Sequence, residues 1–397
     1  MLLKNCRYII TQDAKRRVLE NADVLIEGDE ISGVGKGLKA GRGVDAIDCS
    51  SKIVMPGLVN THTHLGMHSL RGACDDLELF GWLAELEPLE KKLTPKMVKE
   101  NTLAGLREAV RTGTTTIYDS YKFPEARLEA FHEMGVRGMI SSTVRDEKGL
   151  AESEKFLSGL KSGLVTGAIA ANSVYACDEE VLRKAVEYSD AKGLLRRIHV
   201  GETHKERFDT MQRTGKLAIE YLDSVGFLSE RALLVHCIWI TKGEIRRIAK
   251  AGAKVAHNPV SNMKLASGGV MPLTEMLAEK IIVGLGTDGV ASNNNLDMFE
   301  EMKVAALLHR HHKWDANAVS AQQMLDMATI NGAWCLGMEG IGSIEAGKKA
   351  DIITLGISEN MGPMNDAVSN IVFAANGLNV GDVIIDGKII LEDGKFH

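Results

Sequence analysis

The sequence of 397 residues lacks the usual marks of secreted, membrane-bound and disulfide-rich proteins. Its six cysteines are scattered and form no CxxC pair, which argues against a disulfide framework or a cysteine-based zinc site. No stretch approaches the roughly 18 apolar residues that cross a bilayer. The N-terminus has no long apolar core followed by a small-residue cleavage site. We therefore predict a cytoplasmic protein with no membrane partner.

An excess of positive charge is also absent. The net charge is −6, and the isoelectric point is near 6.1. A weakly acidic chain has no electrostatic attraction to nucleic acid or to an anionic membrane, so a small-molecule partner is expected. No GxGxxG follows the first strand of the central region, and no glycine-rich stretch ends in Gly-Lys-Ser/Thr, which argues against dinucleotide and phosphate-loop binding. The composition, with 45% hydrophobic and 25% charged residues, is that of an ordinary globular protein.

Both ends of the chain are rich in short β-like runs. Near the C-terminus, residues 384–395 (IIDGKIILEDGK) contain two Asp-Gly pairs, which are strong hairpin signals. Similar runs at the N-terminus are separated by Asp, Gly and Asn. We predict that residues 1–53 and 345–397 build one small β-sandwich from both chain ends.

The middle of the chain, residues 54–344, alternates short apolar runs with amphipathic helical stretches. One such stretch begins after Thr241, a suitable N-cap, and ends at Gly252, a suitable C-terminal glycine. Strand-helix alternation predicts a parallel sheet with helical crossovers. The eight apolar runs favour an α/β fold of the (β/α)8 TIM-barrel type. An open, doubly wound sheet is the alternative.

Metal-ligand residue types recur at the ends of these predicted strands. His62 and His64 lie two residues apart, so both imidazoles face the same side of a strand, although two ordinary histidines would give the same pattern. His199, His236 and Asp288 end the fifth, sixth and eighth strands. Because the C-terminal ends of barrel strands converge on one mouth, we expect these side chains to meet around a metal ion.

The expected ligand set is three neutral imidazoles and one carboxylate, which suits Zn²⁺ and tolerates Fe²⁺. Glu202, three residues after His199, is either a helix-capping carboxylate or the proton carrier that hydrolysis at a metal requires. His236 is either a satisfied core histidine or a donor that orients the attacking water. Asp288 is expected both to hold the metal and to hydrogen-bond the water.

Two further histidine-bearing segments predict structure rather than chemistry. Residues 309–313 (HRHHK) follow an amphipathic helix in a charged stretch, which is typical of a solvated helix end. His257 ends the seventh strand, but the Asn-Pro pair and Ser261-Asn262 that follow it favour a structural turn.

Several motifs together resemble the amidohydrolase superfamily, and within it the deaminases of S-adenosylhomocysteine, 5′-methylthioadenosine and 5′-deoxyadenosine. The resemblance runs nearly from end to end of the chain. Its motifs are PGLVNTHTH, MHSLRG, HVGET, VHC, HNPVSNMKLASG, GTDGVASNNNLDM and GKKADIITL.

The resemblance implies a (β/α)8 barrel with a terminal β-sandwich, and commonly a dimer or tetramer. It also implies one divalent metal, with Glu202 as acid and base and His236 beside the attacking water. The implied ligands are His62, His64, His199 and Asp288. Trp82 and Glu90 fall where this branch contacts the nucleoside, and Glu90 would accept the ribose hydroxyls; the alternative for Glu90 is a carboxylate on a helix surface.

The sequence departs from the family pattern at two positions. Asn172 stands where the family typically has a histidine after the fourth strand; its amide can hydrogen-bond a heteroaromatic ring but cannot supply a cation. The arginine expected after the third strand is missing, and Arg145, slightly later, is a possible substitute. Neither change touches a ligand or a proton carrier, so both bear on the substrate rather than on the reaction.

We therefore predict a metal-dependent hydrolytic deaminase that releases ammonia from an adenosine-type nucleoside. A first alternative is an enzyme of the same superfamily that acts on guanine, a pterin, cytosine or a triazine. A second, remote alternative is a non-catalytic metal-binding scaffold.

Overall fold

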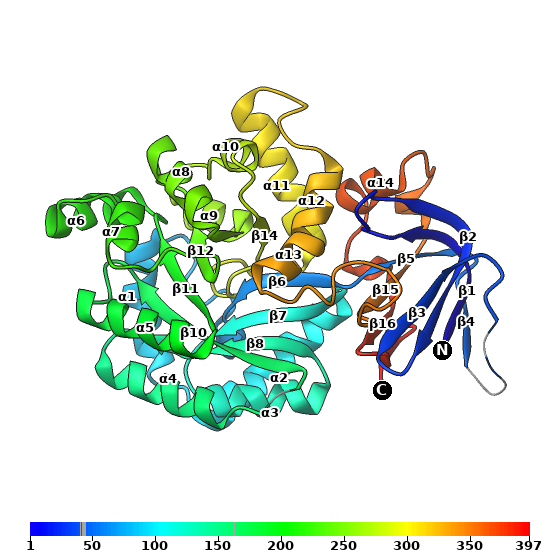
Figure 1. The fold of residues 1–397 in the computed structure, drawn as a ribbon, viewed down its shortest axis with the longest axis horizontal. Coiled ribbons are helices and arrows are strands. Elements are labelled where there is room, and N and C mark those ends of the chain that lie inside the picture. The colour runs from blue at the N-terminus through cyan, green and yellow to red at the C-terminus, as the bar shows by residue number, and fades with distance from the viewer. Residues whose placement is uncertain (40, 42–44, 162) are drawn as a thin grey trace.

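A computed structural model of the protein describes residues 1–39, 41, 45–161 and 163–397, and these contain two nine-stranded sheets. One sheet forms the central barrel, and the other lies beside it and carries both chain ends (Figure 1). Among the described residues, every helix is too short or too polar to reach across a bilayer.

Eight parallel strands form the barrel. They are β6 (Leu58–Thr63), β7 (Thr114–Ser120), β8 (Arg137–Ser141), β10 (Val165–Ser173), β11 (Leu195–Val200), β12 (Ala232–His236), β13 (Lys254–His257) and β14 (Val283–Leu285), with β9 (Thr143–Val144) paired to β10. Polar contacts join the last strand to the first: Thr61 Oγ1 donates to the carbonyl of Leu285 at 2.8 Å, and the Asp288 amide donates to the carbonyl of His62 at 2.9 Å. The predicted barrel is confirmed.

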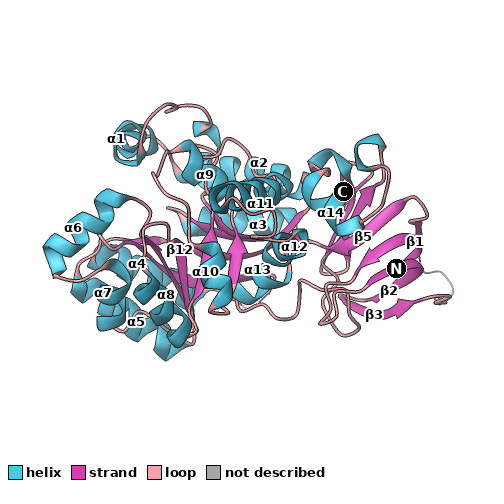
Figure 2. Cartoon of the chain, turned by 90° about the horizontal axis from the view of Figure 1, so that it is seen from above, coloured by secondary structure: helices cyan, strands magenta, loops and turns pink. Residues whose placement is uncertain are grey.

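Helices cover the outside of the barrel (Figure 2). They are α2 (Pro95–Arg111), α3 (Pro124–Met134), α4 (Glu147–Gly159), α5 (Glu179–Lys192), α7 (Ala218–Ser224), α8 (Lys242–Ala251), α10 (Leu273–Ala278), α11 (Met298–Lys313), α12 (Ala321–Ala328) and α13 (Ile330–Cys335). Helix α8 has the predicted ends: Thr241 Oγ1 accepts from the Glu244 amide, and Gly252 adopts a φ of 68°. Ile245 and Ile248 are buried on its inner face, so an apolar stripe and two caps are enough to specify this helix.

Further short elements follow the strands at the mouth of the barrel. These are η1 (Leu65–Leu70) and α1 (Leu79–Glu90) after β6, α6 (His204–Thr214) after β11, and α9 (Pro259–Lys264) after β13. They belong to the loops that carry catalysis in barrel enzymes.

The second sheet combines both ends of the chain. Its strands are β1 (Leu2–Ile10), β2 (Val18–Glu27), β3 (Glu30–Gly35), β4 (Ala46–Asp48), β5 (Lys52–Pro56), β15 (Ile352–Gly356), β16 (Val380–Ile385), β17 (Lys388–Glu392) and β18 (Lys395–Phe396), accompanied by η2 (Glu359–Met361), α14 (Ala367–Phe373) and η3 (Gly377–Asn379). Strand β5 joins the two halves, because it pairs with β1 on one side and with β15 on the other. Residue 53, the predicted boundary, lies within β5, and the division between the two parts of the chain stays a prediction.

The two predicted Asp-Gly turns join β16 to β17 and β17 to β18. At the first, Asp386 and Gly387 have φ angles of 52° and 75°, as a tight hairpin turn requires. The same turn is tied to the barrel, because Arg137 Nη2 donates to Asp386 at 2.7 Å while Arg137 Nε donates to Asp351 at 2.6 Å. A single half-buried guanidinium thus links the start of β8 to the terminal sheet.

Candidate active site

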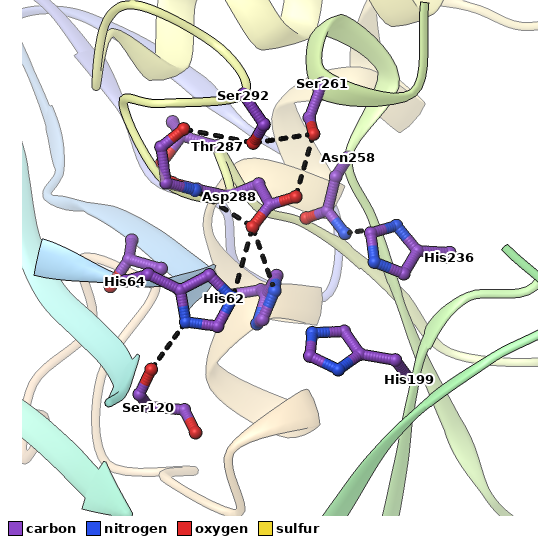
Figure 3. Close-up of polar contacts among 12 residues, drawn as sticks. His62, His64, Ser120, His199, His236, Asn258, Ser261, Thr287, Asp288 and Ser292 are labelled. Atoms are coloured by element: carbon purple, nitrogen blue, oxygen red, sulfur yellow. Dashed lines mark hydrogen bonds and ion pairs between the residues drawn. The ribbon is translucent and has the colours of Figure 1, made fainter. Parts of the chain in front are cut away.

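The histidines predicted from strand ends converge at the mouth of the barrel (Figure 3). His62 belongs to β6, and His64 follows that strand directly; His199 belongs to β11. The ring centroids of His62 and His64 lie 4.7 Å apart, and those of His62 and His199 lie 5.1 Å apart. Two strands of the barrel thus deliver three imidazoles to one point, as the convergence of parallel strands requires.

Asp288 and His236 complete this cluster. Oδ1 of Asp288 lies 3.3 Å from Nε2 of His62 and 3.3 Å from Nε2 of His64. His62 belongs to two groups of potential metal ligands. The ligand atoms of His62, His64 and His199 lie within 4.8 Å of one another, and so do those of His62, His236 and Asp288.

Backbone carbonyls orient two of the imidazoles. Nδ1 of His64 lies 2.5 Å from the carbonyl oxygen of Ser120, and Nδ1 of His199 lies 2.6 Å from that of Asn172. In each case Nδ1 must carry the hydrogen, so Nε2 presents its lone pair to the cluster. Metal-binding histidines are commonly oriented in this way.

The charge states of these groups also fit a divalent ion. Burial and the nearby Arg197 guanidinium hold the pKa of His62 and of His199 well below the ordinary value, so both rings are neutral. Burial opposes ionisation of Asp288, but the His62 hydrogen bond and the surrounding histidines outweigh it and lower its pKa. Neutral imidazoles and an ionised carboxylate are the forms that bind zinc.

A buried ion pair holds the residues on both sides of His64. Oδ1 of Asp119 accepts from the Leu65 amide at 2.7 Å and from Thr63 Oγ1 at 3.2 Å. Oδ2 of Asp119 accepts from Nη1 of Arg127 at 2.7 Å, and both side chains are fully buried. Because the two charges pair with each other and with backbone groups, the segment that carries His64 is held rigidly.

Glu202 lies beside the cluster, with Oε2 3.6 Å from Nε2 of His236. Its loop is fixed by Glu206, which accepts the Gly201 and Glu202 amides at 3.0 and 2.8 Å. Burial, together with the charges of Asp288 and Glu206, raises the pKa of Glu202 well above its usual range. A carboxyl group with a raised pKa holds a proton more readily than an ordinary one, which suits a proton carrier better than a helix cap.

The asparagines after β13 orient His236. Nδ2 of Asn262 donates to Nδ1 of His236 at 2.9 Å, and Nδ2 of Asn258 lies 3.4 Å from the same atom. Burial lowers the pKa of His236 to about 4, so the ring is neutral and its hydrogen is on Nε2, which faces Glu202. His236 is therefore a hydrogen-bond donor toward the cavity.

A cavity of about 810 Å³ opens above the cluster, which is ample room for a nucleoside. Its lining includes every residue predicted to contact substrate: Trp82, Glu90, Arg145, Asn172, Glu202 and Asp288. His64, His199 and His236 also line the cavity.

The predicted substrate contacts differ in how firmly they are held. Trp82 is buried and donates its indole hydrogen to the carbonyl of Ala291 at 3.3 Å. Oε1 of Glu90 accepts from the Tyr121 hydroxyl at 2.5 Å, which fixes its carboxylate in the cavity wall. Asn172 is half-buried behind His199, whereas Arg145 is exposed at the rim.

The sequence profile of the amidohydrolase family matches residues 53–390. The chain belongs to the amidohydrolase family. This match spans the barrel and most of the C-terminal part of the second sheet.

Relatives of this amidohydrolase include proteins named for deamination of adenosine derivatives. The chain is 39% identical to a 5′-deoxyadenosine deaminase of Methanopyrus kandleri over 96% of its length and 91% of the relative. It is 40% identical to a 5-methylthioadenosine/S-adenosylhomocysteine deaminase of Thermococcus onnurineus, over 94% and 90% of the two chains. A crystal structure of an adenosine deaminase from Xanthomonas campestris with bound zinc superposes with a TM-score of 0.96 at 30% identity and covers 100% of this chain and 94% of that one.

Sequence reasoning missed several polar partners of the site. The sequence predicts only a structural turn at Ser261 and Asn262, but Ser261 Oγ donates to Asp288 Oδ2 at 2.7 Å and Nδ2 of Asn262 donates to His236. Arg197, two residues before His199, contacts His62 and His199 inside the barrel of this amidohydrolase. The alternation of a strand was the available signal for Arg197, because residues i and i+2 share a face.

One prediction about histidines was wrong. His309 is fully buried rather than part of a solvated helix end, and its Nε2 lies 3.0 Å from Nε2 of His257. The reason is that α11 packs one face against the barrel, and His309 lies on that face. His311 and His312 are exposed, as expected for a solvated helix end.

Proposed function

We propose that this amidohydrolase removes the amino group of an adenosine-type nucleoside by hydrolysis and releases it as ammonia. The observation that carries the proposal is a buried Glu202, with a raised pKa, beside a cluster of imidazoles and a carboxylate in a nucleoside-sized cavity. The names of the relatives from M. kandleri and T. onnurineus support the adenosine class.

The proposed ligands of one divalent ion are His62, His64, His199 and Asp288. Their chemistry favours zinc, and Fe²⁺ is the next candidate. When bound there, the ion supplies a Lewis acid that makes water a nucleophile near neutral pH.

Side chains of this protein carry out the proton transfers of the proposed reaction. Glu202 accepts a proton from the attacking water and delivers it to a ring nitrogen, while the oxygen adds to the carbon that bears the amine. Nε2–H of His236 donates a hydrogen bond to that oxygen and stabilises the charge that develops on it. A second proton, passed through Glu202 or Asp288, reaches the amino group, which leaves as ammonia while a carbonyl forms.

The remaining cavity residues would position the nucleoside. Trp82 offers an apolar wall, and Glu90 accepts hydrogen bonds from the ribose hydroxyls. The Asn172 amide can donate to and accept from a heteroaromatic ring. Arg145, at the exposed rim, would contact the outer part of the substrate.

We further propose a cytoplasmic location and a dimer or tetramer. All six cysteines are buried free thiols, which fits a reducing compartment. Sedimentation of the purified protein would give the oligomeric state.

Ammonia release from a panel of aminated rings tests the proposed function. We expect turnover of at least one of adenosine, 5′-deoxyadenosine, 5′-methylthioadenosine and S-adenosylhomocysteine, and loss of that turnover after metal removal by chelation. A panel in which guanine, a pterin or a triazine reacts while every adenosine derivative stays inert would overturn the substrate class.

A further inference from the structure

Arg197 places a buried positive charge against the proposed metal ligands. It lies on β11, two residues before His199, so its side chain points into the barrel as that of His199 does. Its Nη2 lies 3.1 Å from both Nδ1 and Nε2 of His62, and it also contacts Nε2 of His199.

Few hydrogen bonds satisfy this guanidinium, although the nearby charges of Asp288 and Glu202 favour its ionised form. Among the described residues, no carboxylate forms an ion pair with Arg197, and its Nε and Nη1 have no hydrogen-bond partner. The adjacent Arg196 is equally buried, but it points away and binds Asp190, Ser189 and the carbonyl of Phe227. A buried cation with unsatisfied donors is costly, so Arg197 stands out from the other internal arginines.

The contact with His199 conflicts with metal binding. Nδ1 of His199 faces the carbonyl of Asn172 and carries the hydrogen, so Nε2 holds the only lone pair that this ring directs into the cluster. One lone pair cannot accept an N–H from Arg197 and bind a metal ion at the same time. In addition, a fixed positive charge a few ångströms away repels a dication.

We propose that Arg197 is an internal competitor for the divalent ion, which lowers the metal affinity of the cluster and must withdraw from His199 when the ion binds. This inference rests on the ligand set named in the proposed function, but it does not depend on the identity of the substrate. It assigns Arg197 a role in metal loading rather than in the chemical step.

Zinc affinity of an Arg197→Met variant tests the proposal. Metal-free native and variant proteins are titrated with zinc against a chromophoric chelator at one pH and ionic strength. We expect the variant to bind zinc at least about tenfold more tightly. Arg246→Met, which removes the same charge from an exposed position on α8, should leave the affinity unchanged. An affinity in Arg197→Met that equals or falls below the native value would overturn the proposal.

Two further measurements cover the case in which Arg197→Met does not fold. Arg197→Gln removes the charge but keeps a polar side chain, and it should also bind zinc more tightly. In a crystal structure of the zinc-loaded native protein, Nη2 of Arg197 should have left Nε2 of His199; a preserved contact beside the bound ion contradicts the inference.

The zinc titrations also distinguish a failure of this inference from a failure of the proposed ligand set. Native protein that binds zinc, with variants that bind no more tightly, defeats only the role of Arg197. Native protein and variants that all fail to bind zinc defeat the ligand set, and the inference with it.

Discussion

The hydroxyl of Ser261 donates to Oδ2 of Asp288 at 2.7 Å, which leaves Oδ1 to face His62 and His64. The Asp288 backbone is fixed as well, because its amide donates to the carbonyl of His62 and its φ is 61°, a conformation few non-glycine residues adopt. The carboxylate therefore reaches the cluster through one defined oxygen. Its orientation depends on a residue from the neighbouring helix α9.

We expect Ser261→Ala to weaken metal binding or turnover by about 10- to 100-fold, the usual effect of losing a partner that orients a metal ligand. Zinc content after dialysis and kcat for the preferred nucleoside are the measurements. Ser292→Ala is a matched control: its hydroxyl lies 3.0 Å from that of Ser261 but does not contact Asp288. Equal effects of the two substitutions would show that the Asp288 contact is not the cause.

We expect Glu202→Gln to keep the metal and to lose turnover by roughly 10²- to 10⁴-fold, because an amide cannot carry the proton from water to the ring. Metal analysis and ammonia release measure the two properties separately. Glu206→Gln changes the neighbouring buried carboxylate, which holds the loop but does not line the cavity, so it should retain more activity. An active Glu202→Gln enzyme would remove Glu202 from its assigned role.

The sequence predicts a site residue well where the type of the residue and its position in the fold both point to the same role. His62, His199 and Asp288 were predictable because strand ends of a parallel barrel meet at one mouth, and the hairpin at Asp386 was predictable because few residue pairs adopt its backbone angles. Ser261 was not, because the face that a residue of a short helix presents depends on how that helix packs. The prediction for His309 failed for the same reason. The local charge pattern indicated an exposed side chain, but the packing of α11 buries it.

The contact between Glu90 and Tyr121 leads to a prediction about ribose recognition. We expect Glu90→Gln to raise KM for nucleosides with intact ribose hydroxyls more than it lowers kcat, since the carboxylate would contact the sugar and not the reacting carbon. Tyr121→Phe removes the hydroxyl that donates to Glu90 without removing the carboxylate, and should have a smaller effect. KM for matched ribose and 2′-deoxyribose substrates is the measurement. If Glu90→Gln affected both sugars equally, the ribose assignment would fail.

The buried pair of His257 and His309 should make the stability of the protein depend on pH. Burial lowers the pKa of His309 to about 4, whereas an unfolded histidine titrates near 6.5. Between these values the unfolded chain binds a proton that the folded chain does not, so the free energy of unfolding falls as the pH drops from about 6.5 to about 4, and His309 contributes no further change below that. The full effect of a 2.5-unit difference is on the order of 3 kcal/mol.

We expect His309→Gln to reduce, but not abolish, the pH dependence of the free energy of unfolding across this window, whatever it does to stability at neutral pH. Denaturant unfolding of the metal-free protein at several pH values measures the slope. His311→Gln is the matched control, because His311 lies on the same helix and is exposed, so its removal should leave the slope unchanged. The lowered pKa of His257 leaves part of the dependence in place. Native and His309→Gln proteins with the same slope would mean that His309 titrates in the folded protein as it does in the unfolded chain.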